Sequence, residues 1–390
     1  MTFSNPSRIR ELDGLRGIAI LLVIVFHYFY GNLQPPDGSL PYYAKALMRL
    51  TWSGVDLFFV LSGFLIGGIL IDAKGSDNFF KTFYIRRTFR IFPLYIAFCL
   101  GYFLLLVVTR YHETVVEVLK PPMPWWAYAT FTTNIWLSAN TSEVFGAALW
   151  SLGVEEQFYL TLPLLVYLLP RNRLAPVLLA LIVATPVVRM LLMWVRPDLY
   201  VHTLVISRAD SLLLGVMGAL LVRDNAKMEW LTSRRWPLNV TIAVCGSAMC
   251  FFLYQNWILG TAGMAYIGYT VLAVFYLALL LAGITRPESR WAWILRNRAL
   301  RGMGGIAYCA YLMHEPVMAV LFWMNGKYRP SLAGPQDALI LVAAFAVTVV
   351  VGVLSWRWFE APLVRMGHRY QYAAVSSPVN SSVKVSAAGS

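Results

Sequence analysis

Long apolar segments recur along the whole chain, separated by short stretches that contain charged residues, proline or glycine. A helix needs about 20 apolar residues to cross the roughly 30 Å hydrocarbon core of a bilayer. Ten segments approach this requirement, at 14–30, 52–71, 89–109, 148–169, 174–194, 204–222, 238–257, 263–283, 303–324 and 337–356. The pattern predicts an all-α, polytopic membrane protein with about ten transmembrane helices.

The short apolar segment 125–139 decides the orientation of everything that follows it. It comes after three prolines and carries Thr132, Thr133 and Asn134, which is unusual for a membrane span. If it does not cross and the N-terminus is cytoplasmic, 23 of the 32 basic residues face the cytoplasm and 7 face outward. Cytoplasmic loops of membrane proteins carry an excess of Lys and Arg. We therefore predict ten spans, with both termini cytoplasmic and 125–139 interfacial or re-entrant.

The composition agrees with a membrane protein and argues against other classes. Hydrophobic residues make up 59% of the 390-residue chain, charged residues only 13%, and the mean hydropathy is +0.62. Soluble domains carry about 25% charged residues. The net charge of +13 would suggest nucleic-acid binding in a soluble domain, but here the basic residues flank apolar segments, so no nucleic-acid partner is expected. The four cysteines lie within apolar segments without CxxC spacing, and no metal site is predicted.

The chain is predicted to form one membrane domain, 1–370, and a disordered cytoplasmic tail, 371–390. Its last 17 residues are rich in Ser, Val, Ala and Gly and are too polar to form a core. Basic residues precede the first apolar segment, as in a secretory signal, but that segment is long, contains His27 and lacks a cleavage site. We expect it to remain as the first span.

Ionisable residues inside membrane spans are energetically costly, and each is therefore a candidate functional residue. The candidates considered are Arg16, His27, Asp56, Glu155, Glu156, Arg189, Arg208, Asp210, His314 and Glu315. In the predicted topology most of these residues lie in one layer near the outer end of the bundle.

Arg16 and His27 in the first span are 11 residues apart, which is close to three full helical turns, so they share a face. Their separation along the helix axis is about 16 Å, with Arg16 at the cytoplasmic surface and His27 well across the bilayer. Taken alone, Arg16 also fits a basic residue flanking a span, and His27 also fits a hydrogen-bonded core histidine.

Five segments have an unusual local sequence: RELDGLRGIAILLVIVFH from Arg10, GVDLFFVLSGFLIG from Gly54, FYIRRTFRIFPLY from Phe83, LWSLGVEEQFYL from Leu149 and AYCAYLMHEP from Ala307. In this order they resemble acyltransferase family 3, the polytopic membrane O-acyltransferases that modify bacterial surface polysaccharides and some secreted or antibiotic glycosides. SRADSLLLG from Ser207 is similar to a further segment of the family. The likeness extends over roughly 10–360.

The resemblance implies a function and a location. The protein would take an acyl group, expected to be acetyl, from cytoplasmic acyl-CoA and pass it to a hydroxyl of an extracytoplasmic carbohydrate or glycoside. It would lie in the bacterial inner membrane, surrounded by membrane lipid. The family motifs correspond to an Arg-His pair, a basic loop and a Ser-Gly motif, which in this chain are Arg16 with His27, Arg87 with Arg90, and Ser62 with Gly63.

The residues themselves fit this chemistry. Acyl transfer to a hydroxyl needs a base for the alcohol proton and positive or hydrogen-bonding groups at the developing charge. His27 can serve as the base, because an imidazole titrates near neutral pH, and Glu155 at a similar depth could orient it. Planar guanidinium groups bind phosphates well, so the acyl-CoA phosphates are assigned to Arg16, Arg86, Arg87 and Arg90.

Structural interpretations stay open for several of these residues. The three loop arginines could form an ordinary basic loop that contacts anionic lipid. Glu155 could be a helix-packing carboxylate paired with Arg189 or Arg208. Asp56 and Asp210 are more typical of structural partners for such arginines.

His314 and Glu315 precede Pro316 and could simply mark a helix kink. We keep both as second-rank site candidates, together with Asp56, Ser62, Arg208, Asp210 and Tyr311.

A transporter of a small polar or anionic substrate is the alternative function. Buried charge in a ten-span protein also fits a substrate pathway. The sequence shows neither an internal repeat nor paired broken helices, which argues against this alternative.

Overall fold

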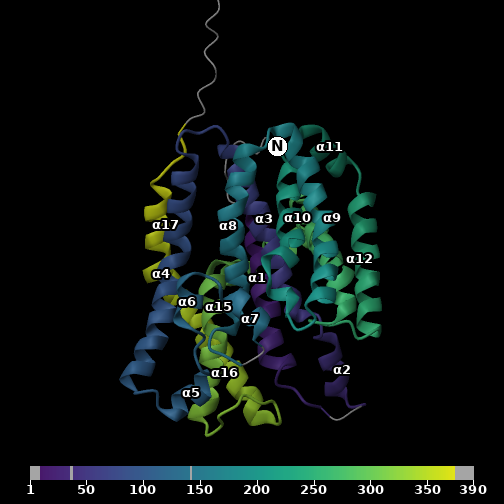
Figure 1. Cartoon of the computed structure of the whole chain (residues 1–390). Coiled ribbons are helices and arrows are strands. Elements are labelled where there is room, and N and C mark those ends of the chain that lie inside the picture. The colour runs from purple at the N-terminus through teal and green to yellow at the C-terminus, as the bar shows by residue number, and fades with distance from the viewer. Residues whose placement is uncertain (1–8, 36–37, 141–142, 374–390) are drawn as a thin grey trace, which may run out of the picture.

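The computed structural model describes residues 9–35, 38–140 and 143–373. These residues form a bundle of helices, most of which run approximately along one axis (Figure 1). They contain no strand, and a single β-bridge joins Leu33 to Leu332. The predicted all-α class is confirmed.

Eight helical segments within this part of the chain are long and apolar enough to cross a membrane. All eight overlap predicted spans. They are α1 (Arg10–Val25) with η1 (Phe26–Tyr30), α2 (Leu40–Leu47) with η2 (Thr51–Ser53) and α3 (Gly54–Ala73), α4 (Phe79–Val108), α9 (Arg171–Val195), α12 (Trp236–Tyr254), η6 (Met264–Gly268) with α13 (Tyr269–Thr285), α15 (Arg298–Met324), and α16 (Pro335–Ser355) with η7 (Trp356–Glu360) and α17 (Ala361–His368).

The other two predicted spans correspond to helices that are shorter or more polar. α8 (Trp150–Leu168) has a polar first half that includes Glu155 and Glu156. α10 (Ala209–Leu221) has only 13 residues, because two 3-10 turns, η4 (Val201–Thr203) and η5 (Val205–Ser207), precede it. Such a helix is about 20 Å long, less than the hydrocarbon thickness. Length and composition therefore support eight spans where the sequence predicted ten.

The segment 125–139 forms two short helices, α6 (Trp125–Ala129) and α7 (Thr133–Ala139). Phe131, between them, has a positive φ of 54°, which breaks the helical path. A seven-residue helix is only about 10 Å long. Neither helix can cross a bilayer, in agreement with the predicted interfacial or re-entrant segment.

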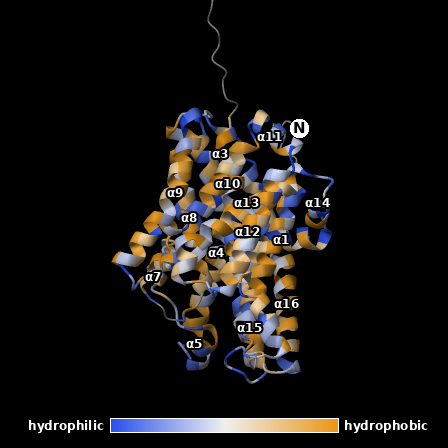
Figure 2. Cartoon of the chain, turned by 90° about the vertical axis from the view of Figure 1, so that its right-hand side faces the viewer, coloured by the Kyte–Doolittle hydropathy of each residue, from blue (hydrophilic) through white to orange (hydrophobic). Residues whose placement is uncertain are grey.

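The two ends of the bundle differ from its middle. We call the end at which α1 begins the N-terminal side; Figure 1 shows α11 (Asn225–Ser233) at this end and α2 and α5 (Glu113–Leu119) at the opposite end. Figure 2 shows hydrophobic residues along the helices and hydrophilic residues gathered at the ends. Large apolar side chains on the outer helices stay exposed, among them Leu104, Leu179, Val244 and Val350. Because lipid would cover these side chains, the fold is that of a multi-pass membrane protein.

α1 lies at the centre, packed along α15 on one side and α3 on another. Two glycines let the backbones of α1 and α15 meet: a Cβ added at Gly17 would lie 2.0 Å from the carbonyl oxygen of Leu300, and one at Gly304 would lie 1.9 Å from that of Asp13. Small residues allow such close packing in membrane helices. The two helices run parallel, so the far end of α1 lies beside the second half of α15.

The chain after α17 returns to the start of α4. Asn78 donates from its side-chain amide to the Gln371 carbonyl at 2.9 Å and accepts from the Ala373 backbone N–H at 2.8 Å. These first residues of the predicted tail are therefore attached to the membrane domain. The rest of that tail, 374–390, lies outside the described residues.

Candidate active site

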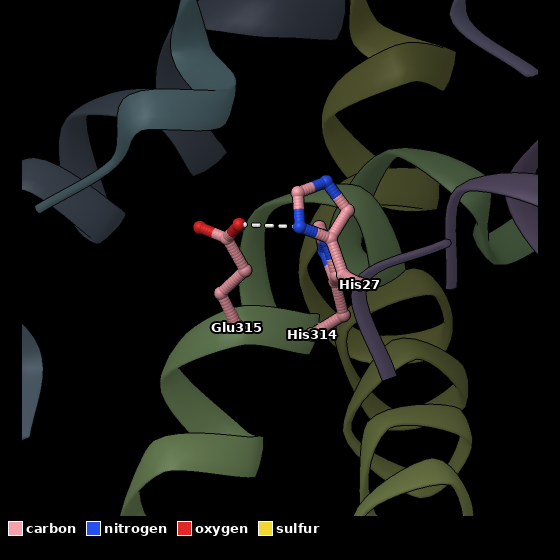
Figure 3. A group of neighbouring side chains, drawn as sticks. All are labelled: His27, His314 and Glu315. Atoms are coloured by element: carbon pink, nitrogen blue, oxygen red, sulfur yellow. Dashed lines mark ion pairs between the residues drawn. The ribbon is translucent and has the colours of Figure 1, made fainter. Parts of the chain in front are cut away.

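His27 and Glu315 contact each other in the half of the bundle away from the N-terminal side. Nδ1 of His27 lies 2.8 Å from Oε1 of Glu315, and both side chains are about 30% exposed (Figure 3). His27 lies in η1, a π-helical turn that widens the end of α1, a feature that recurs at functional sites. Asn32 secures this turn by donating to the carbonyls of His27 at 2.7 Å and Tyr28 at 3.0 Å.

A second histidine, His314, packs against His27. His314 is fully buried, and its ring meets the His27 ring edge to face, with centroids 4.9 Å apart. Its Nδ1 lies 2.7 Å from the Tyr311 carbonyl, which can only accept, so Nδ1 carries the proton and Nε2 is an acceptor. Nε2 is buried without a hydrogen-bond partner. The backbone of His314 is held in turn by the Tyr28 hydroxyl, which donates to its carbonyl at 2.9 Å.

One ligand atom from each of His27, His314 and Glu315 lies within 4.8 Å of the others. Two imidazole nitrogens and a carboxylate oxygen are a donor set that suits Zn²⁺. The three side chains could therefore hold a divalent cation. The sequence analysis found no metal site because these ligands come from two helices far apart in the chain.

His27 and Glu315 line a cavity of about 250 Å³. Several aromatic side chains line it, among them Trp52, Trp150, Tyr200, His202 and Tyr311. His202 lies in η4, outside the membrane-crossing segments, and burial lowers its pKa to about 3, with a further contribution from the nearby Arg208. His202 is thus a neutral, buried part of the wall, whereas the His27 side chain is partly exposed.

Two buried ion pairs lie beside the cavity. Arg208 donates to Asp56, and Arg189 donates to Asp210 with Nη2 2.8 Å from Oδ2. Both guanidinium groups also stack on the ring of Tyr269, at 4.0 Å for Arg208 and 5.2 Å for Arg189. Asp56 and Asp210 are therefore the partners of the membrane-embedded arginines, as one sequence interpretation held. Asp56 and Arg208 also face the cavity.

Glu155 does not contact His27. Its carboxylate accepts a hydrogen bond from the Tyr159 hydroxyl at 2.9 Å, and Tyr159 is also bonded to the Ser62 hydroxyl. α8 starts with Trp150 in the cavity wall and runs toward the N-terminal side. Glu155 is five residues further on, so it lies about 7.5 Å from Trp150 along the helix axis, away from the cavity. The structure thus corrects the expected pairing: Glu315, and not Glu155, is beside His27. Arg189 and Arg208 are not its partners either.

Arg16 and two arginines gather on the N-terminal side of Glu155; the structure places these two, expected in a basic loop, within helix α4. Arg87 and Arg90 of α4 are close enough to Arg16 to act on it electrostatically, and Arg16 and Arg87 also act on Glu155. Nε of Arg87 is buried without a partner. Arg86 does not join this cluster, because its Nε donates to the Tyr370 carbonyl at 2.7 Å and its guanidinium stacks on Tyr372. It projects from α4 toward the chain after α17.

Tyr311 connects α15, which carries Glu315, to α8, which carries Glu155. Its hydroxyl donates to the Ala148 carbonyl at 2.9 Å and shares a 2.6 Å hydrogen bond with Ser151. It therefore ties α15 to the start of α8 at the cavity wall.

The contact of Glu315 with His27 and that of Tyr159 with Glu155 were not predicted from the sequence. A signal for Glu315 was present, since it adjoins His314 and falls at the same expected depth as His27, but its position before Pro316 suggested a kink. Tyr159 follows Glu155 by four residues, one helical turn, which places the two side chains together. Both residues lie within the motifs quoted above.

The protein is thus a polytopic membrane bundle with a histidine–carboxylate pair in one half and an arginine cluster in the other. The chain belongs to the acyltransferase domain family, whose family model matches residues 9–357. The resemblance to acyltransferase family 3 is confirmed.

Curated relatives bear names that agree with this family. YrhL of Bacillus subtilis, named for peptidoglycan O-acetyltransfer, is 28% identical over 386 residues, covering 92% of this chain and 55% of its own length. The peptidoglycan O-acetyltransferase OatA of Listeria monocytogenes is 28% identical, with 92% and 56% covered. The O-acetyltransferase OatA of Staphylococcus aureus is 24% identical, with 94% and 58% covered. The chain thus spans just over half the length of these relatives. No solved structure matches it.

Proposed function

We propose that the protein is a membrane O-acyltransferase that moves an acyl group, in the first place acetyl, from acyl-CoA to a hydroxyl of a carbohydrate or glycoside on the other face of the membrane. The observation that carries the proposal is the 2.8 Å contact between His27 Nδ1 and Glu315 Oε1 in the wall of a cavity. The family match and the names of the relatives support the reaction class. They also favour an enzyme over the alternative of a transporter.

His27 is the general base in this proposal. Its Nδ1–H donates to the Glu315 carboxylate, which fixes the tautomer and leaves Nε2 as the acceptor. Figure 3 shows Nε2 on the part of the ring that points away from Glu315. A substrate hydroxyl in the cavity gives its proton to Nε2 as its oxygen attacks the thioester carbonyl. When the C–S bond breaks, the imidazolium returns this proton to the thiolate, and the products are an ester and a free thiol.

The arginine cluster binds the donor in this proposal. Arg16, Arg87 and Arg90 gather near the N-terminal side, and a partly unpaired guanidinium there suits phosphate. The axial distance from Arg16 to His27 is about 16 Å, which the extended pantetheine arm can cover. Ser62, Tyr159 and Glu155 lie between the cluster and the cavity and would provide polar contacts along this path.

The proposal places the N-terminal side in the cytoplasm, where acyl-CoA is found. The excess of basic residues expected on this side supports it. Cysteine labelling in intact cells tests the orientation at Arg290, at the start of α14 (Arg290–Leu295). Reaction of Arg290→Cys with an impermeant reagent added outside would contradict it.

Acetyl transfer by the purified chain tests the activity. Protein in detergent is incubated with acetyl-CoA labelled in the acetyl group and with a soluble oligosaccharide of N-acetylated sugars, the acceptor class that the relatives' names suggest. Labelled ester and free CoA thiol should appear together. A transporter would leave the thioester intact, and thiol release without ester would show that this acceptor class is wrong.

A further inference from the structure

A groove of about 520 Å³ lies between α15 and the α16–η7–α17 segment, apart from the cavity of the candidate active site. Three arginines from three elements border it: Arg301 of α15, Arg357 of η7 and Arg365 of α17. Gly302 and Gly305 form part of its floor, and a Cβ added at either would meet no atom within 4 Å. The groove is therefore open where a ligand would approach the guanidinium groups.

The positive charge in this groove is not balanced by carboxylates of the described residues. None of the three arginines forms an ion pair among the described residues, and Nε of Arg301 is buried without a hydrogen-bond partner. Glu360 is close in sequence, but it is buried and accepts a 2.8 Å hydrogen bond from Ser355. The described part of the groove therefore carries positive charge that no carboxylate neutralises.

The rest of the groove is apolar and continues onto the outer surface of the bundle. Ile306, Val353 and Trp356 line it. Adjoining side chains of α16 and η7 are exposed and large, including Val350, Leu354, Trp358 and Phe359. Arg301 is within one turn of the start of α15, so the charged end lies near the N-terminal side, at the level expected for lipid headgroups. A ligand with an anionic head and apolar chains would satisfy both parts.

We propose that this groove binds an anionic glycerophospholipid from the leaflet on the N-terminal side. Its phosphodiester would accept charge-assisted hydrogen bonds from Arg301, Arg357 and Arg365, and an acyl chain would lie against Ile306, Val353 and Trp356. A free nucleotide phosphate could use the arginines but would leave the apolar wall uncovered. The bound lipid would hold α15, which carries His314 and Glu315, against α17, which packs on α4 with its donor-cluster arginines. This inference does not depend on the proposed reaction.

Native mass spectrometry of the full chain in detergent tests the proposal. The protein is titrated with phosphatidylglycerol, with phosphatidylcholine of the same chains, and with adenosine 3′,5′-bisphosphate as a soluble phosphate probe. We expect phosphatidylglycerol to bind with the highest affinity and the bisphosphate not to displace it. Arg357→Gln with Arg365→Gln should weaken phosphatidylglycerol binding by roughly tenfold or more, since each surface arginine contributes about 1 kcal/mol.

The matched control removes two charges elsewhere on the same side of the bundle. Arg171 and Arg173 at the start of α9 are exposed and form no ion pair within the described residues, so Arg171→Gln with Arg173→Gln changes net charge equally without touching the groove. It should bind phosphatidylglycerol as the unmodified protein does. If the groove variant does not fold, Arg365→Ala alone serves, with size-exclusion behaviour as the check. Equal binding of the two lipids, unchanged binding by the groove variants, or displacement by the bisphosphate would overturn the proposal.

Discussion

Glu315 Oε1 lies 2.8 Å from Nδ1 of His27, although one residue belongs to α15 and the other to the turn that ends the first helix. Two contacts establish this relationship. Glycines bring the backbones of α1 and α15 together, and the Tyr28 hydroxyl binds the His314 carbonyl next to Glu315. A carboxylate on one imidazole nitrogen leaves the other nitrogen free to take a proton. This contact is the basis of the proposed reaction.

The first prediction separates the two carboxylates. Glu315→Gln keeps the side-chain volume but offers no charge to His27, so the ring loses both its favoured tautomer and stabilisation of its protonated form. Acyl transfer should fall by roughly a hundredfold or more. Glu155→Gln should cost roughly tenfold or less, since Glu155 bonds to Tyr159 and not to the base. The measurement is transfer rate in membranes at matched protein level; a larger loss for Glu155→Gln would restore the pairing expected from sequence.

The second prediction concerns donor binding. Arg16→Ala and Arg90→Ala should each raise the KM for acyl-CoA about tenfold or more, because each removes a charge-assisted contact of roughly 1.5–3 kcal/mol. Arg86→Ala is the control, since its guanidinium binds the Tyr370 carbonyl and stacks on Tyr372. It should leave this KM nearly unchanged. An equal effect of all three substitutions would indicate a general influence of basic charge at this surface.

The third prediction concerns metal. His27 and Glu315 contact each other directly, so dialysis against a chelator should leave the transfer rate unchanged. Added Zn²⁺ should inhibit, because the nitrogen and oxygen atoms of His27, His314 and Glu315 are near enough to bind it and would then occupy the base. Loss of activity on chelation, with recovery on adding Zn²⁺, would instead make these three residues a resident metal site.

The fourth prediction tests the helix contact that positions the pair. Gly17→Ala places a Cβ where the carbonyl oxygen of Leu300 is only 2.0 Å away, so the helices must separate. We expect a loss of stability of roughly 1–3 kcal/mol, the usual cost of overpacking, together with reduced transfer. Gly101→Ala on α4 has no atom within 4 Å of its new Cβ and should be neutral. Thermal unfolding in detergent compares the stability of the two variants. Equal melting temperatures would show that α1 and α15 can tolerate separation.

The length of the apolar segments was sufficient to predict most of the long helices, because a helix must reach a minimum length to cross a bilayer. It did not predict how short α10 is, because the apolar run from 204 contains the 3-10 turn η5 and only 13 of its residues form the α-helix. The expected depths place His27 and Glu315 in the same layer of the bundle. Depth could not choose between Glu315 and Glu155, because that choice depends on how α1, α8 and α15 pack. Because burying an unpaired charge is costly, Asp56 and Asp210 were expected to pair with arginines. The structure identifies these partners as Arg208 and Arg189.

The most direct test of the account is acyl transfer by His27→Gln. Glutamine retains hydrogen bonding and approximate volume but cannot accept and release a proton near neutral pH. Transfer from labelled acetyl-CoA to the carbohydrate acceptor is measured in membranes, with expression level and size-exclusion behaviour as checks on folding. The account predicts a loss of roughly a hundredfold or more with an unchanged fold. Near wild-type transfer by His27→Gln would contradict it and remove His27 from the reaction.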